Sequence, residues 1–145
     1  MAHVRKQIRE AAATLVTGLA ATGAHVFQSR VYPLKATDLP CLLVNTDDED
    51  ITTDSIGTLQ LERTLRLGVR GVAKEAADLD DTLDAMLEQV ETVLNGATFS
   101  GKAKACVLTS VRIQMDAIQD KPVGVVDMGF TVIYFTAGSA PGTAI

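Results

Sequence analysis

Five carboxylates crowd into one short stretch of this chain, namely Asp47, Asp48, Glu49, Asp50 and Asp54. Side chains of this type can ligate a divalent cation, work as a general acid and base, or keep a surface loop hydrated until a partner arrives. Carboxylates alone do not separate these uses, so the spacing and the neighbouring elements have to do so.

The spacing of the acidic residues does not fit a calcium loop. An EF-hand loop needs glycine at its sixth position and glutamate at its twelfth. A loop counted from Asp48 has Thr53 and Leu59 there, and one counted from Asp50 has Ser55 and Leu61. The sequence instead predicts a hairpin-like loop whose tip faces water or a partner, with weak and non-specific cation binding as the alternative.

Other catalytic patterns are lacking in the sequence. His3 and His25 have no nucleophile motif near them, and neither a GxSxG elbow, a P-loop nor a GxGxxG turn occurs. Cys41 and Cys106 form no zinc pattern and are expected to be buried thiols. A pair of carboxylates for acid–base work stays open, but nothing singles one out. The sequence therefore favours a protein that is not an enzyme and has no cofactor or metal.

Length and composition predict one globular domain. The chain has 145 residues, of which 47% are hydrophobic and 21% charged, and its formal net charge is -5. An acidic balance argues against a non-specific binder of nucleic acid or of a membrane surface. No signal sequence or membrane-length apolar run is seen, so we expect a cytosolic product.

The periodicity of apolar residues predicts the first elements. A helix is expected over residues 2–22, ending at Gly23, and strands over 25–34 and 41–46 with a proline-containing loop between them. Residues 58–73 alternate strictly, so they predict a strand of ~40 Å or more. Arg63 is the one charged residue on its apolar face. Such a strand either bends at a bulge near residues 62–64 or projects beyond the domain.

The second half of the chain predicts a helix and two strands. The clearest helix spans 75–95, and strands follow over 105–118 and 123–136. The order α-β-β-β-α-β-β predicts an α+β, two-layer sandwich in which a mostly antiparallel sheet of about five strands carries two helices on one face. We expect one domain over 1–137 and a flexible tail over 138–145.

Three arginines of the long strand allow two interpretations. Arg63, Arg66 and Arg70 either form an ordinary polar strand face, with Arg63 at a bulge, or a charged strip that meets an acidic neighbour. That neighbour would be the 47–54 stretch of another subunit, and such complementarity would fix the register of a ring.

The layout of the chain resembles the tail-terminator (minor tail protein U-like) family of long-tailed bacteriophages. The resemblance rests on an opening helix "VRKQIREAAATLV", a strand "HVFQSRVYPL", the passage "KATDLPCLLVNTDDEDI", the long strand "LQLERTLRLGVRG", the acidic helix "DLDDTLDAMLEQVETVL" and a closing strand "MGFTVIYFT". It covers roughly residues 4 to 136.

The resemblance implies a structural virion protein without catalytic residues, assembled in the host cytoplasm. Such a protein would form a hexameric ring that caps the tail tube, stops its polymerisation and meets a head-completion or connector protein. DNA would only pass through its channel. Six copies at -5 give the ring a charge of about -30, which would repel DNA phosphates. The alternatives are another head–tail neck component, a small α+β ligand-binding module, or an enzyme that uses the acidic stretch with a divalent ion.

Overall fold

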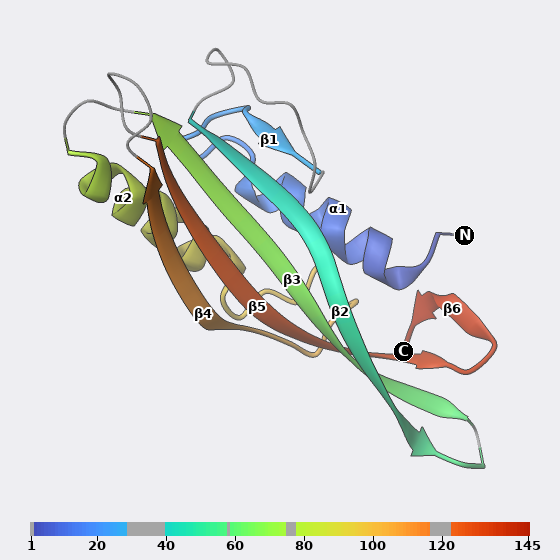
Figure 1. Cartoon of the computed structure of the whole chain (residues 1–145). Helices are drawn as coiled ribbons and strands as arrows, with labels where there is room; N and C mark the ends of the chain where they lie inside the picture. The colour runs from blue at the N-terminus through green and yellow to red at the C-terminus, as the bar shows by residue number, and fades with distance from the viewer. Residues whose placement is uncertain (1, 29–39, 58, 75–77, 117–122) are drawn as a thin grey trace.

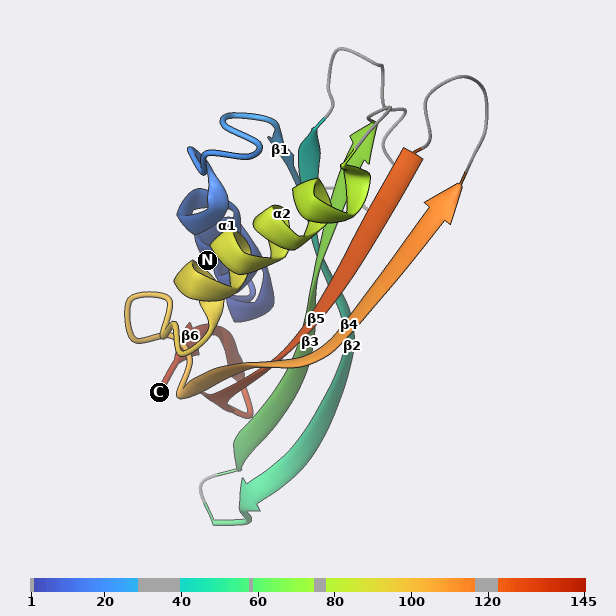
Figure 2. The same cartoon turned by 90° about the vertical axis from the view of Figure 1, so that its left-hand side faces the viewer.

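The computed structural model describes residues 2–28, 40–57, 59–74, 78–116 and 123–145. Both helices lie on one side of a long twisted sheet, which confirms the predicted α+β sandwich and the order of its elements (Figures 1 and 2). The elements are α1 (Val4–Val16), β1 (Val26–Phe27), β2 (Cys41–Ser55), β3 (Gln60–Lys74), α2 (Leu79–Leu94), β4 (Ala105–Asp116), β5 (Val123–Ala137) and β6 (Ala140–Ala144).

The six-stranded sheet is antiparallel except at one edge. Its strand order is β1-β2-β3-β5-β4, in which β1 runs parallel to β2, and β6 pairs with the end of β5. The central pair β3–β5 keeps one unbroken register from Gln60 opposite Ala137 to Lys74 opposite Val123. This pair is therefore the rigid axis on which the other strands are placed.

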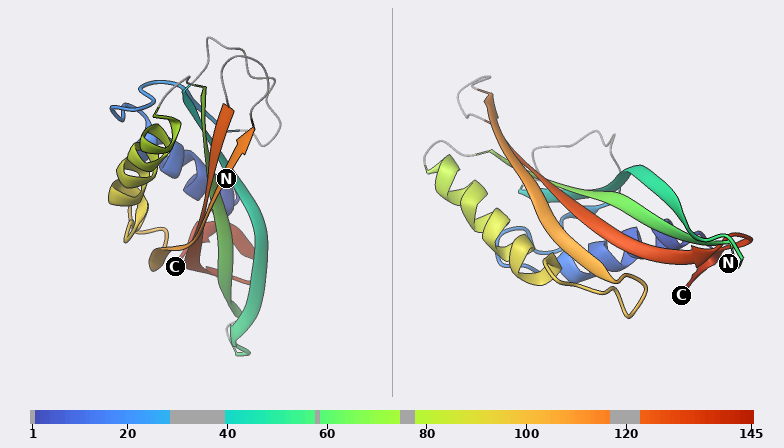
Figure 3. Two further views of the ribbon diagram at one scale, coloured as in Figure 1. Left: turned by 60° about the vertical axis from the view of Figure 1, so that its left-hand side comes forward. Right: turned by 90° about the horizontal axis from the view of Figure 1, so that it is seen from below.

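The core fills the space between the helices and the sheet, which Figure 3 shows from two further directions. Each helix turns an apolar stripe with spacings of three and four residues towards the sheet, as its sequence predicts. Alternate residues of β3 and β5 pack against these stripes from the sheet. The most deeply buried side chains include Ile8, Val16, Leu65, Leu67, Leu83, Met86, Met128, Phe130 and Tyr134.

Helix α1 is shorter than the sequence predicts. It ends at Val16 because Thr17 has extended backbone angles and Gly18 takes a positive φ of 90°. The chain then closes a tight turn in which the Gly23 amide donates to the Leu19 carbonyl, at 2.7 Å. Gly18, and not Gly23, is thus the residue that stops the helix.

The acidic stretch is part of a strand, which corrects the prediction of a loop. Strand β2 runs on past Thr46 to Ser55 and stays paired with β3 throughout, except at two shifts of register. Acidic residues are poor strand formers in isolation. Here, however, the pairing with β3 brings the side chains of Arg63 and Arg66 within reach of the acids, and the prediction of a strand ending at residue 46 missed that partner.

The long strand β3 projects, as one of the two predicted options requires. The other option, a bulge near residues 62–64, is wrong. Both shifts of register between these strands lie in its partner β2, between Thr46 and Glu49 and between Thr53 and Ser55. Strand β4 pairs no farther along than Ile133, so the β2–β3 hairpin continues beyond it. Figures 1 and 2 show this hairpin leaving the body of the domain, and we call residues 50–57 and 59–62 the arm.

Two predicted segments, the C-terminal tail and the strand over 25–34, differ from the structure or lie partly outside the described residues. The prediction of a free tail missed β6, where Ala140 lies opposite Ala137 and Ala144 opposite Thr136. The sequence of this segment lacks the alternation that would announce a strand. Of the strand predicted over 25–34 the structure gives β1, while residues 29–39, the predicted loop included, lie outside the described residues. No helix in the described ranges is long and apolar enough to cross a membrane.

Gly71 sets how closely α2 approaches the sheet. A Cβ atom at this position would lie 2.8 Å from the Met86 Cε atom and 2.9 Å from Val126 Cγ1. We expect Gly71→Val to lower the free energy of unfolding by about 1–3 kcal/mol, since the core would have to move apart. Urea denaturation measures this. Gly57→Val is the matched control, because no atom lies within 4 Å of its Cβ position. Equal stability of the two variants would contradict the close packing.

Candidate functional site at the base of the arm

An extra residue in β2 decides which acid faces the core. Thr46 pairs with Leu67 and Glu49 with Leu65, so three steps along β2 match two along β3. Because side chains alternate between the two faces of a strand, this bulge turns Glu49 towards the helices in place of Asp48. One carboxylate of the acidic stretch is thereby placed at the base of the arm and is almost completely buried, with 6% of its side chain exposed.

Arg63 meets Glu49 on the same face. This is the arginine that interrupts the apolar alternation of β3, and its side chain is only 9% exposed. Its Nη1 lies 3.3 Å from the Glu49 Oε2 atom, and its Nε donates to the Thr136 hydroxyl at 2.9 Å. Tyr134, on β5, donates its hydroxyl to the Glu49 Oε1 atom. The base cluster, as we call Glu49, Arg63, Tyr134, Thr136 and His3, thus joins three strands.

The start of α1 closes the base cluster from the helix side. The His3 Nε2 atom lies 3.5 Å from Arg63 Nη1, and its Nδ1 accepts the Arg5 amide at 3.1 Å as the cap of the helix. Arg5 also reaches β2, where its Nη2 donates to the Asp47 carbonyl at 2.9 Å. These contacts tie the first turn of α1 to the bulge.

Burial shifts the pKa of two members of the base cluster, His3 and Tyr134. It lowers the pKa of His3, which Arg63 lowers further, while Glu49 opposes the shift and Arg5 adds to it. Burial also raises the pKa of the Tyr134 hydroxyl, and the hydrogen bond to Glu49 acts in the same direction. The Tyr134 hydroxyl therefore stays protonated and donates to Glu49. Among cysteines, burial raises the pKa of Cys106 to about 11.

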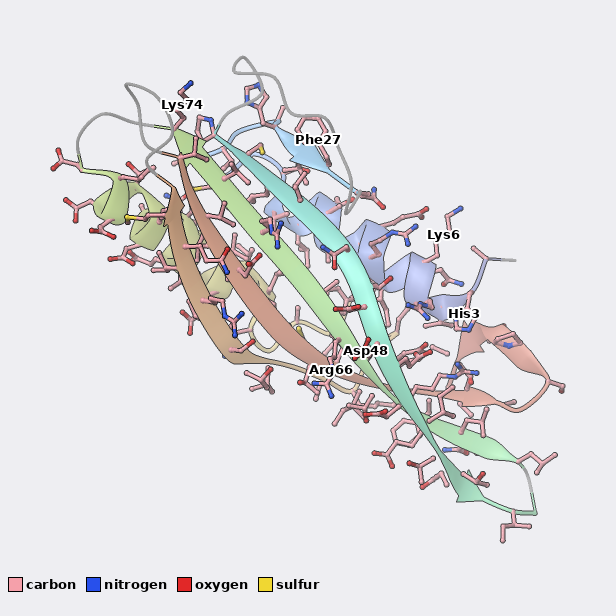
Figure 4. All side chains as sticks on the ribbon, in the orientation of Figure 1. His3, Lys6, Phe27, Asp48, Arg66 and Lys74 are labelled. Carbon is pink, nitrogen blue, oxygen red and sulfur yellow. The ribbon has the colours of Figure 1, made fainter. Side chains whose placement is uncertain are left out.

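The remaining predicted residues lie on the opposite, helix-free face or on the arm. Arg66 lies between two acids of β2, with Nε 3.8 Å from Asp48 Oδ2 and Nη2 3.9 Å from Asp50 Oδ2. Figure 4 shows Asp48 and Arg66 on these neighbouring strands. All three side chains are more than half exposed, so each contact is weak. Asp54, on the arm, accepts from Gln60 Nε2 at 3.2 Å.

Arg70 makes the strongest surface pair, but with a residue that the sequence did not single out. Its guanidinium lies on the Asp127 carboxylate of β5 at 2.6 and 3.4 Å. The structure thus brings two of the predicted arginines, Arg63 and Arg66, to predicted acids within one chain. A contact with another subunit stays a prediction. Sequence reasoning missed His3, Tyr134, Thr136 and Asp127. The one available signal was Arg63 itself, since a cation on an apolar face requires a partner.

The helix-free face carries a shallow hollow of about 480 Å³. Its floor is a row across four strands, in which Gly68 lies opposite both Asn45 and Gly129, and Gly129 lies opposite Ser110. The glycines leave room for the side chains at either end of the row: the Asn45 Oδ1 atom lies 2.9 Å from where a Cβ of Gly68 would be, and the Ser110 hydroxyl lies over Gly129 in the same way. Its lining offers amide, hydroxyl and guanidinium groups and the carboxylates of Asp47 and Asp127. In the described part of the chain no three potential ligands gather into a metal site.

Loss of Arg63 should cost far more stability than loss of Arg66. Arg63→Met would remove the nearer cation from the buried Glu49 and leave it only Arg5, whose Nη1 lies 4.0 Å from Oε2. We expect this to lower the free energy of unfolding by about 3 kcal/mol. Arg66→Met, the matched control on the same strand, breaks only exposed contacts and should change it by less than about 1 kcal/mol. Urea unfolding followed by circular dichroism compares the two. Similar losses would show that the base cluster does not anchor the arm.

The cluster should also make stability depend on pH. With the pKa of His3 lowered by folding, the unfolded chain binds more protons at His3 below its ordinary value of 6.5. The contribution of this residue is therefore full above that pH and is lost as pH falls towards the folded pKa. We expect His3→Asn, which retains a helix cap, to lose less stability than the wild type between pH 7.5 and pH 5.5. Parallel declines in urea unfolding would refute this.

Comparison with known proteins identifies the chain. A solved structure of the "Virion of native gene transfer agent (GTA) particle" has the same fold, with a TM-score of 0.53, 18% identity and coverage of 90% of each chain. No curated protein sequence matches. The family model of phage minor tail protein U matches residues 3–134. Since this match spans most of the sequence, the protein belongs to the phage minor tail protein U family and is a structural component of the virion tail.

Proposed function

We propose that this tail protein forms a ring, with six copies as the expected number, that caps the tail tube and ends its polymerisation. The opposite face of the ring would provide the surface to which the head joins through a completion or connector protein. The ring acts by contact alone and carries out no catalysis. Membership of the minor tail protein U family supports the setting in the tail.

The arm is the observation that carries this proposal. A hairpin of two 15-residue strands extends past the helices, and large apolar side chains stand exposed along it, at Ile51, Ile56 and Leu59. Ile56 is 85% exposed. A projecting ribbon with apolar side chains in water favours aggregation unless a partner covers it. The base cluster holds this ribbon in place, so it is suited to reach a neighbouring subunit.

Charge supports a passive role towards DNA. Six copies at -5 would give the ring about -30. A channel lined by acids would repel the phosphates and let DNA pass without binding. Asp48 and Asp50 keep 74% and 79% of their side chains exposed despite the nearby Arg66, so they are available to such a channel. A ring structure that places these acids on its outer rim would refute this part of the proposal.

Two alternatives remain beside the terminator. A different neck component would share the virion setting but act on the head side. A ligand-binding module with its pocket between helices and sheet fits less well, because apolar side chains pack that space in the described residues and the hollow of about 480 Å³ lies on the other face.

Deletion of the gene tests the proposal. A phage without this protein should assemble tails of abnormal and variable length in electron micrographs, and the protein supplied in trans should restore one length. Tails of normal length that fail to join heads would instead indicate the neck alternative. Light scattering of the purified protein should approach six chains of 15.3 kDa, or about 92 kDa, at high concentration and with magnesium present to screen the acids.

A further inference from the structure

The sheet has two open edges that lie at opposite ends of its strands. On the β2 side, β1 pairs only with Leu42 and Leu43, and the Asp47 carbonyl accepts a hydrogen bond from the Arg5 side chain. From residue 49 to 55 no described strand pairs with that edge. On the β4 side, the turn after α2 covers the first residues, where the Gly96 amide donates to Cys106 and Asn95 accepts from Leu108. Among the described residues, 109–116 have no further strand beside them.

Both edges present apolar side chains on the helix side of the sheet. On β4, Val111, Ile113 and Met115 lie opposite core residues of β5, yet each is more than 40% exposed, because α2 does not cover this half of the strand (Figure 2). On β2, the register with β3 puts Ile51 on that same face, and it is 51% exposed. An exposed edge strand with an apolar stripe is a template for another strand.

The helix-free side of the two edges carries opposite charges. Asp50 lies opposite Thr64 there, while Arg112 lies opposite Asp127 on the β4 side. The two open stretches have seven and eight residues by number, or about 23–26 Å at ~3.3 Å per residue, so they also match in length.

We infer that the open edge of β2 in one copy of the chain pairs with the open edge of β4 in a second copy. This continues the sheet from subunit to subunit and rests on the proposed ring. Ile51 then joins the apolar stripe of β4 on the helix side, and Asp50 meets Arg112 on the other side. The occupant of each edge is thus another copy, because the charge and the apolar pattern agree on both faces at once.

The pairing is head-to-tail, so it generates a ring or a filament and not a two-fold dimer. In the sheet β2 and β4 run in opposite directions, since each of the three steps from β2 to β4 is antiparallel. Copies in the same orientation therefore pair these edges antiparallel. Because the open stretches lie at opposite ends of the strands, neighbours are staggered, which a closed ring accommodates with tilted strands as a barrel does.

Two edge variants test this pairing by complementation. Ile51→Asp spoils the β2 edge and Ile113→Asp the β4 edge, and both sites are exposed enough to leave folding intact. Each variant alone should self-associate at least about tenfold more weakly than the wild type in analytical ultracentrifugation. A mixture retains one good interface, between the β4 edge of the first variant and the β2 edge of the second. It should therefore form 1:1 dimers and nothing larger.

Leu15→Asp changes a residue of α1 that is 41% exposed and should assemble like the wild type. The pairing would be overturned if both edge variants assembled like the wild type, or if their mixture stayed monomeric while the wild type assembled. It would also be overturned if the wild type were monomeric at ~1 mM. Tail length tests the function separately. If both edge variants restore tails as the wild type does, the pairing fails and the terminator stands; if the wild type restores none, the terminator fails.

Discussion

The contact between Glu49 and Arg63 is the constraint on which the shape of this protein depends. An arginine buried on an apolar strand face is stable only with a partner, and the bulge in β2 supplies the carboxylate. From β5, Thr136 accepts from the Arg63 Nε and Tyr134 donates to the second Glu49 oxygen, and His3 lies against Arg63 from the helix side. The three long strands are thereby fixed to one another where the apolar core ends and the arm begins.

On one side of the base cluster, the body of the domain is stabilised by the packing of the helices on the sheet. On the other side, the arm is held by strand pairing alone. The helices cover β3 and β5 with aliphatic side chains, as the low aromatic content requires. The arm has no helix on it, and it exposes the apolar side chains of Ile51, Ile56 and Leu59 to water. A single polar anchor therefore separates a stable body from an extension whose exposed surface suits assembly.

Much of this fold could be predicted from the sequence because its signals are periodic. The two helices, the alternation of β3 and the packed face of β5 all follow from spacing. The acidic stretch could not be assigned to a strand, because the bulge before Glu49 breaks the two-residue period and Ile51 alone marks the helix-side face there. Arg63 indicated a buried partner, but that this partner is Glu49 depends on the register set by the bulge in β2. Likewise, β6 depends on pairing with β5, which its composition does not announce.

The central claim is that the arm and the β4 edge are the surfaces where subunits meet. Hydrogen–deuterium exchange, compared below and above the concentration at which the protein assembles, tests it most directly. The account predicts that assembly slows exchange at residues 49–55 and 109–116, with no comparable change in α1 or α2. Slower exchange confined to the helices, with both edges unchanged, would contradict it.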